Sequence, residues 1–462
     1  MYRRLYHLGI AAYAVMFLFA IIFYKERIIF LDTAFVLFHM LKDGAFDVQI
    51  YRLGDAFSQI MPLLASKAGS SLNTIIMSYS VGLISSYFIP YIICGSILKQ
   101  YRLALFILLL NLLFASDTFY WPISQVPQGM ALLVLILALI NGKEINSISL
   151  LRWALLLVLL VVLVFFHPLM LMVTGYALVF FFLSKDQFFQ KKMLYLIAGL
   201  FFVILIIKMT LFKVPYERHS LSGLKNFVRL FPDYIHLYSN KQFLHNCVTK
   251  YYWIPILSAG IIIVYARAKE WMKLGLFLAA MSGYFLLVNV SYPTAETPQF
   301  YIENLYLPLG FFIVLPFLFD LAPLLEKRKL VMPVIVLIMI TGCIRIYTTH
   351  TPYTARLAYE RHLLDQYGDK KVILAAAKVD TATLQMVWGS AYEFWLLSTS
   401  ERGYTASINI DADAKKFGDA AYRKKSMVVT WDAFRYDQLD PRYFQFKDTT
   451  TGYIIDPSAP LR

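Results

Sequence analysis

Charged side chains are scarce in this chain of 462 residues. Asp, Glu, Lys and Arg make up 16% of it, against roughly 25% in an ordinary soluble domain, and hydrophobic residues make up 59%. Apolar runs of roughly 20 residues, the length that a helix needs to cross hydrocarbon, recur along most of the chain. The composition therefore excludes a single soluble domain and predicts a membrane-embedded protein.

Cysteine is also scarce, and no internal repeat or low-complexity run is evident. Three cysteines make neither a disulfide framework nor a zinc-binding pattern. The missing repeat disfavours an inverted-repeat transporter. No small-residue cleavage site follows the first apolar segment, Leu8 to Phe23, so we interpret that segment as a retained helix and not as a signal peptide.

A series of apolar segments dominates the first three quarters of the sequence. Windows of about 19 residues predict a polytopic α-helical membrane protein with about eleven transmembrane helices. The predicted spans are residues 8–24, 72–98, 103–115, 128–141, 150–166, 169–183, 193–212, 254–266, 272–291, 304–322 and 330–346. The fifth and sixth spans are divided at His167-Pro168, because proline disfavours a helical residue before it.

Basic residues divide sharply between the two sides of this predicted bundle. The short connections on the side of the amino terminus contain fifteen Lys and Arg residues, whereas the short connections on the other side contain none. Because basic loops stay in the cytoplasm, we expect a cytoplasmic amino terminus and an extracytoplasmic carboxyl tail, as in a bacterial inner membrane protein. Most of the net charge of +14 then follows from topology, and no nucleic-acid partner is expected.

Three polar segments are long enough to hold structure outside the spans. Residues 1–346 form the predicted transmembrane domain, with long extracytoplasmic loops at residues 25–70 and 213–253. Residues 347–462 have the charge content of a soluble protein and predict a small extracytoplasmic α/β domain. Its expected strands are 371–377, 404–410, 426–431 and 452–455, and its expected helices are 381–398 and 411–422.

Asp32 lies just after the first predicted span, at the start of an apolar stretch with helical spacing. This stretch suits an amphipathic helix that lies on the membrane surface, which would hold the carboxylate at the mouth of the bundle. One interpretation makes Asp32 the N-cap of that helix, and the other makes it a catalytic carboxylate. Asp43, Asp47 and Asp55 follow in the same loop as weaker candidates for an acidic partner.

Two segments of the chain resemble the GT-C glycosyltransferases, multi-span enzymes that use polyprenyl-phosphate-linked sugars. The first is Leu31-Asp32-Thr33-Ala34-Phe35, an acidic residue near the start of the first extracytoplasmic loop, with Leu41 to Gly44 as part of its surface helices. The second, Phe300 to Leu309, contains Tyr306-Leu307-Pro308 and is similar to the Tyr-Leu-Leu-Pro stretch that often opens a late helix in bacterial members.

This resemblance implies a membrane enzyme that moves a sugar from a polyprenyl-phosphate-linked donor to an extracytoplasmic glycan or lipid acceptor. It also implies that Asp32 is the general base or the carboxylate that positions the acceptor. Many members carry two adjacent acidic residues in this loop, whereas Thr33 follows Asp32 here. Use of a divalent metal as a cofactor therefore stays open.

The second long loop has the positive charge that a departing lipid phosphate requires. Arg218, His219 and Lys225 are the candidates for binding the donor phosphate. The alternative is a basic surface loop that meets anionic membrane lipid. Three further residues at the same predicted face are candidates for the substrate pocket: His167, Glu296 and Glu303.

Two other classes of function are compatible with the layout. A transporter or flippase for a lipid-linked substrate would need ionisable groups near the bilayer midplane, and few are visible because Lys208 and Asp320 lie near span ends. A scaffold that displays the carboxyl domain would need no acidic residue in the first loop. Substitution of Asp32 by Asn separates the enzyme from the scaffold.

Overall fold

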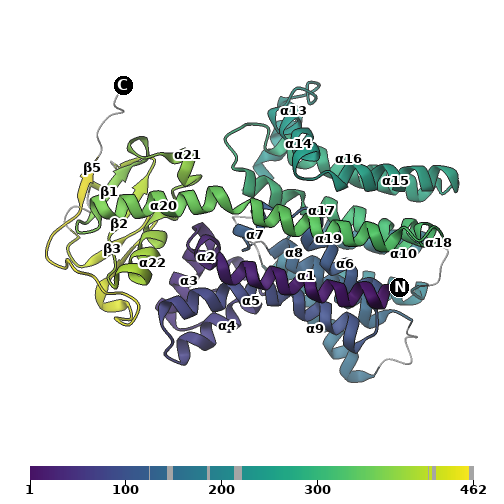
Figure 1. The fold of residues 1–462 in the computed structure, drawn as a ribbon, viewed down its shortest axis with the longest axis horizontal. Coiled ribbons are helices and arrows are strands. Elements are labelled where there is room, and N and C mark those ends of the chain that lie inside the picture. Colours follow the sequence, from purple (N-terminus) through teal and green to yellow (C-terminus); the bar gives the residue numbers. More distant parts are fainter. Residues whose placement is uncertain are drawn as a thin grey trace.

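The computed structural model describes residues 1–123, 125–142, 149–184, 188–212, 221–414, 416–418 and 423–456. It is an elongated bundle of helices with the strands gathered at one end and the amino terminus at the other (Figure 1). We call the end that carries the strands the domain end of the bundle. The candidate site lies there.

Six helical segments in the described chain are long and apolar enough to cross a membrane. They are α1 (Tyr2–Ile22), α5 (Leu72–Ile92) with its extension η2 (Ile93–Ile97), α11 (Lys191–Leu211), α16 (Trp271–Ser291), α17 (Gln299–Pro316) with η5 (Phe317–Leu321) and α18 (Ala322–Lys327), and α19 (Val331–Thr348) with α20 (His350–Tyr367). A seventh span results if α14 (Tyr238–Thr249) and α15 (Trp253–Arg267), which are bent by 89°, count as one.

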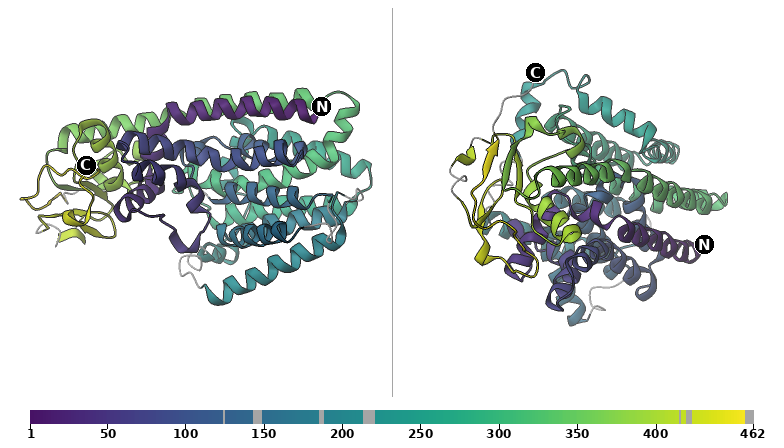
Figure 2. Two further views of the ribbon diagram at one scale, coloured as in Figure 1. Left: turned by 90° about the horizontal axis from the view of Figure 1, so that it is seen from below. Right: turned by 60° about the vertical axis from the view of Figure 1, so that its left-hand side comes forward.

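Four apolar helices are shorter: α6 (Tyr101–Leu113), α8 (Gln125–Ile140), α9 (Leu150–Phe166) and α10 (Met170–Leu183). Each predicted span falls on one of these long or short helices, but the count of about eleven transmembrane helices is not confirmed, since six or seven have the required length and composition. The side chains of α6 from Leu103 onward and all those of α8 except Pro127 are buried, so these two helices form the centre of the bundle. Figure 2 shows α1 beside α19 along one side.

The first long loop folds into α2 (Tyr24–Ile28), α3 (Leu31–Asp43), the short turn η1 (Gln49–Tyr51) and α4 (Asp55–Lys67). The helix predicted after Asp32 is present as α3, and its apolar side was expected to face the membrane surface. Its apolar side is covered by the carboxyl domain, where Phe38 packs edge-to-face on Trp395 and Phe444 with ring centroids 5.3 and 5.4 Å away. An amphipathic pattern predicts one covered face without identifying its cover.

The second long loop contains η4 (Leu221–Lys225), α13 (Asn226–Arg229) and α14 in its described part. Between α6 and α8 lies one further short helix, α7 (Asp117–Tyr120). It packs against α17, so it belongs to the domain end of the bundle core.

The carboxyl domain combines helices with a small sheet, as predicted. β1 (Val372–Ala375) is central and pairs in parallel with β2 (Ile408–Asp411) and β5 (Ile454–Asp456), while β3 (Ser426–Val428) and β4 (Ala433–Arg435) form an antiparallel hairpin. The predicted helix 381–398 is broken into α21 (Thr381–Leu384) and α22 (Ser390–Arg402). The described parts of 411–422 hold turns and a short 3-10 segment instead of the expected helix.

Candidate functional site

A cavity of about 680 Å³ lies at the junction of the bundle and the carboxyl domain. Its walls come from the first loop, the breaks between apolar helices, α16, α17 and the carboxyl domain. The lining side chains on which the argument depends are Asp32, Arg52, Asp55, Trp121, Gln125, His167, Asn304, Trp388 and Trp431. Three residues predicted from the sequence as candidates, Asp32, Asp55 and His167, are thus brought together by the fold.

Asp32 is the second residue of α3 and lies on the cavity wall. The N-cap position belongs to Phe30, so the interpretation of Asp32 as the cap is wrong. The indole Nε1 of Trp121 donates a hydrogen bond of 3.0 Å to Asp32 Oδ2. Burial raises the pKa of Asp32 to about 6, although the bond from Trp121 acts in the opposite direction. A carboxylate with this pKa accepts a proton readily near neutral pH.

The backbone before Asp32 is held by the carboxyl domain. Leu31 adopts φ +43°, an uncommon conformation for a leucine, and its amide donates a 2.6 Å hydrogen bond to Glu393 Oε1 of α22. The other oxygen of Glu393 forms a 2.5 Å ion pair with the buried Arg356, which also donates to the Ile29 carbonyl at 2.7 Å. The domain therefore fixes the residue that precedes the candidate base.

Asp55 begins α4 on the same cavity. Burial raises its pKa to about 7, and the negative charges of Asp47 and Asp32 add to the rise. Arg52 also lines the cavity and donates a 2.6 Å hydrogen bond from Nη1 to Gln125 Oε1. Arg52 was not among the residues predicted for the site, because nothing in the local sequence shows that it and Asp32 share a cavity.

His167 lies at the break between α9 and α10, where its Nδ1 accepts a 3.2 Å hydrogen bond from the Leu169 amide. Burial lowers the pKa of His167 to about 3, and Arg52 and Lys208 lower it further. The imidazole is therefore neutral at physiological pH, which suits a hydrogen-bonding role better than a charged one.

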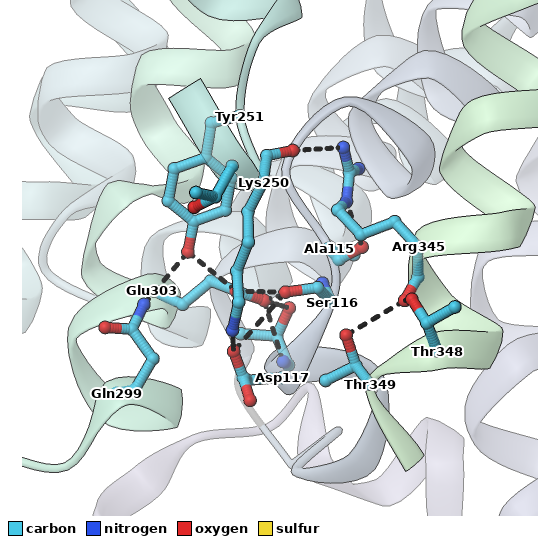
Figure 3. Close-up of polar contacts among 12 residues, drawn as sticks. Ala115, Ser116, Asp117, Lys250, Tyr251, Gln299, Glu303, Arg345, Thr348 and Thr349 are labelled. Atoms are coloured by element: carbon cyan, nitrogen blue, oxygen red, sulfur yellow. Dashed lines mark hydrogen bonds and ion pairs between the residues drawn. The ribbon is translucent and has the colours of Figure 1, made fainter. Parts of the chain in front are cut away.

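Glu303 is completely buried but does not line the cavity, which corrects its assignment to the substrate pocket. It accepts five hydrogen bonds of 2.7–2.8 Å, of which two come from Thr118. The other three come from Ser116, which donates two, and from the Tyr251 hydroxyl (Figure 3). These bonds anchor the start of α7, which leads directly to Trp121. Glu303 thus acts on the site through the position of Trp121.

The cluster around Glu303 also contains an ion pair (Figure 3). Lys250 Nζ lies 2.7 Å from Asp117 Oδ2, and Arg345 Nη1 donates to the Lys250 carbonyl at 2.8 Å. Burial raises the pKa of Asp117, and the negative charge of Glu303 raises it further, while Lys250 lowers it. One cation of the second long loop therefore has a structural partner.

Five other candidate residues lie away from the cavity or outside the described chain. Asp43 is exposed at the far end of α3 and pairs with Lys42, and Glu296 is exposed in the connection between α16 and α17. Lys225 is exposed, but its neighbour Leu224 lines the cavity, so the second loop reaches the rim. The phosphate-binding candidates Arg218 and His219 lie outside the described residues.

Aromatic side chains form a large part of the cavity wall. Trp121 packs edge-to-face on Phe300 with centroids 4.9 Å apart on the bundle side, and Trp388 packs on Trp431 at 5.0 Å on the domain side. Trp121 was not among the residues predicted for the site from the sequence. Its bond to Asp32 spans 89 positions of the sequence, which local patterns do not reveal.

Within the described part of the chain, no three His, Cys, Asp or Glu side chains are grouped so that they could hold a metal ion. Comparisons of the sequence with family models and curated proteins, and of the structure with solved structures, give no match. The functional argument therefore rests on the residues of the cavity.

Proposed function

We propose that the chain is an integral membrane glycosyltransferase of GT-C type. It moves one sugar from a polyprenyl-phosphate-linked donor to a glycan or lipid acceptor on the extracytoplasmic side. The observation that carries this proposal is the position of Asp32, a carboxylate of raised pKa on the wall of a 680 Å³ cavity that also contains Arg52. A base and a cation at one cavity are the two groups that glycosyl transfer to a hydroxyl needs.

In the proposed reaction an acceptor hydroxyl attacks the anomeric carbon of the donor sugar. Asp32 takes the hydroxyl proton as the new carbon–oxygen bond forms. The bond from the anomeric carbon to the phosphate oxygen breaks, and the lipid phosphate leaves with the electron pair. Arg52 stabilises the charge that develops on that phosphate.

The cavity also has a wall suited to the lipid part of the donor. Leu224, Tyr284, Leu287 and Val288 contribute largely apolar surface from η4 and α16. Polyprenyl chains are apolar, so this wall would bind the isoprene units next to the phosphate. Arg218, His219 and Lys225 remain candidates for additional phosphate contacts, and divalent metal use stays open.

The test replaces Asp32 by Asn in the full chain, reconstituted in liposomes that contain undecaprenyl-phosphate-linked sugars. Asn is close to Asp in size and can still accept the Trp121 bond, but it cannot act as a general base. Sugar transfer should fall by about 10² to 10⁴-fold, the usual contribution of such a base. Thermal unfolding should stay near that of the parent.

Asp43→Asn is the matched control, because Asp43 lies on the same helix but is exposed and away from the cavity. It should transfer sugar at the parental rate. Equal activity of Asp32→Asn and Asp43→Asn would remove Asp32 as the base. Absence of transfer by the parent from every undecaprenyl-linked donor would remove the proposed function itself.

A further inference from the structure

Resting on the proposed function, we infer that Trp431 and Trp388 form a stacking platform for a saccharide, which makes the acceptor a glycan and not a lipid. Both residues belong to the carboxyl domain and both line the cavity that contains Asp32. Nothing in the proposed donor site uses them.

Trp431 is exposed by 67%, yet its position is well defined by its surroundings. It lies at the tip of the hairpin between β3 and β4, which is closed by the bond from the Val429 amide to the Asp432 carbonyl at 2.9 Å. The hydroxyl of Thr430 donates to the Trp388 carbonyl at 2.8 Å and ties this tip to the loop before α22. The indole is therefore presented on a rigid turn.

Trp388 packs on the exposed ring of Trp431 and connects it to aromatic side chains of α3 and α22. Its ring centroid is 5.0 Å from that of Trp431 at an interplanar angle of 33°, and it contacts Phe35 of α3 edge-to-face at 6.1 Å. Phe35 is itself packed on Tyr392 of α22. A single exposed aromatic side chain is common on protein surfaces and needs no explanation. Trp431 does need one, because its indole packs on further aromatic rings and lines the cavity that contains Asp32.

A pyranose ring fits this arrangement by its chemistry. One face of the ring is made of C–H groups that stack on an indole, and its edges carry hydroxyls that need hydrogen-bond partners. Polar side chains of Gln49, Asp55, Gln125 and Asn304 line the same cavity and supply such partners. A lipid acceptor would have no use for this mixture of a flat aromatic surface and convergent polar groups.

The platform would hold the sugar next to the one that is modified. Asp32 and Trp431 lie on one cavity but on different structural units, the bundle loop and the carboxyl domain. The acceptor would therefore extend across the junction between them. This assigns glycan recognition to the carboxyl domain and bond formation to the bundle.

The test measures saccharide binding directly, without donor and without transfer. Isothermal titration of the full-length protein in detergent uses chitotetraose, maltotetraose and mannotetraose as probes. At least one probe should bind, Trp431→Ala should weaken that binding by about tenfold or more, and Trp431→Phe should restore part of it. Trp271→Ala is the control, because Trp271 is 62% exposed but begins α16 at the opposite end of the bundle.

Equal affinity in Trp431→Ala and the parent would overturn the inference, and so would an equal loss in Trp271→Ala. Failure of all three probes to bind the parent at millimolar concentration would overturn it as well. Because no sugar is transferred in this titration, a negative result there leaves the proposed function standing if transfer still depends on Asp32.

An aromatic anchor in the lipid headgroup layer is the rival role for Trp431. Fluorescence in nanodiscs containing brominated phosphatidylcholine distinguishes the two roles. Trp431→Phe should leave the lipid-quenched part of the emission unchanged, because the ring lies at the cavity. A decrease as large as that produced by Trp271→Phe would place Trp431 in lipid and overturn the inference.

Discussion

At the residue scale, the burial of Asp32 determines the pH dependence of the proposed reaction. Its pKa is raised to about 6, so a base at this position is mostly protonated below that pH and ionised above it. The rate of sugar transfer at low donor concentration should therefore rise between about pH 5 and 7, with a midpoint near 6. The measurement is kcat/KM for the donor across this range.

Asp55 gives the control for this profile, because its pKa is raised to about 7. The remaining activity of Asp55→Asn should keep the midpoint near 6. If the pH dependence near 6 were lost in Asp55→Asn, the group that titrates in the parent would be Asp55 and not Asp32. A flat profile between pH 5 and 7 in the parent would contradict a base of raised pKa.

Glu303 shows how far a single residue can be interpreted from sequence. An acidic group near the end of an apolar helix is costly to bury, so the sequence marked Glu303 as a residue that would need polar partners. The structure shows those partners. The partners that offset the cost, Ser116 and Thr118, lie about 185 positions earlier in the chain. The sequence therefore indicated that Glu303 matters, whereas its role as an anchor of α7 depends on tertiary contacts.

At the scale of elements, the contact between α3 and α22 is the joint that positions Asp32. A Cβ added at Gly389, the N-cap of α22, would lie 2.9 Å from the backbone Cα of Leu31. The backbone of Leu31 could make room for a methyl group at Gly389 only by moving, and Leu31 is the residue before Asp32. Gly389→Ala should lower kcat for transfer by about tenfold or more, since small misplacements of catalytic groups are costly.

Gly175→Ala in α10 is the matched control, because a Cβ there meets nothing within 4 Å. It should leave both kcat and the unfolding temperature unchanged or slightly raise the latter. If Gly389→Ala transfers sugar as fast as Gly175→Ala, the joint does not position the base.

The contact between α3 and α22 also shows which features of a helix or strand the local sequence pattern does not predict. The apolar spacing after Asp32 predicted α3 within one residue of its start, but its cover, the aromatic side of α22, lies more than 350 positions later. The predicted helix 381–398 fails at Gln385, whose φ of +63° breaks the helix between two segments of good helical pattern. Helix α20 has little apolar periodicity and was not expected at all.

At the scale of the whole molecule, the distribution of Lys and Arg predicts which end of the bundle faces the cytoplasm. The structure places the carboxyl domain and the amino terminus at opposite ends, as the predicted topology requires (Figures 1 and 2). We expect a cysteine at the exposed Thr449 to react in intact cells with a membrane-impermeant maleimide. A cysteine at Ala268, in the turn after α15, should react only after permeabilisation.

The native Cys94, Cys247 and Cys343 are replaced by Ser in both variants, so that only the introduced thiol reports. If the cysteine at position 268 were accessible and the cysteine at position 449 protected, the orientation of the protein in the membrane would be the reverse of the predicted one. The cavity would then open on the cytoplasmic side, away from any extracytoplasmic acceptor.

The most direct test of the central claim is an experimental structure of the full chain with undecaprenyl phosphate bound in a lipid nanodisc. If the protein is a sugar-transfer enzyme, the phosphate should lie in the cavity, beside Asp32 and within about 4 Å of the Arg52 guanidinium. The isoprenoid chain of the lipid should then lie along α16. A phosphate held between the spans near Lys208 or the Lys273–Asp320 pair, away from Asp32, would contradict the account and favour transport.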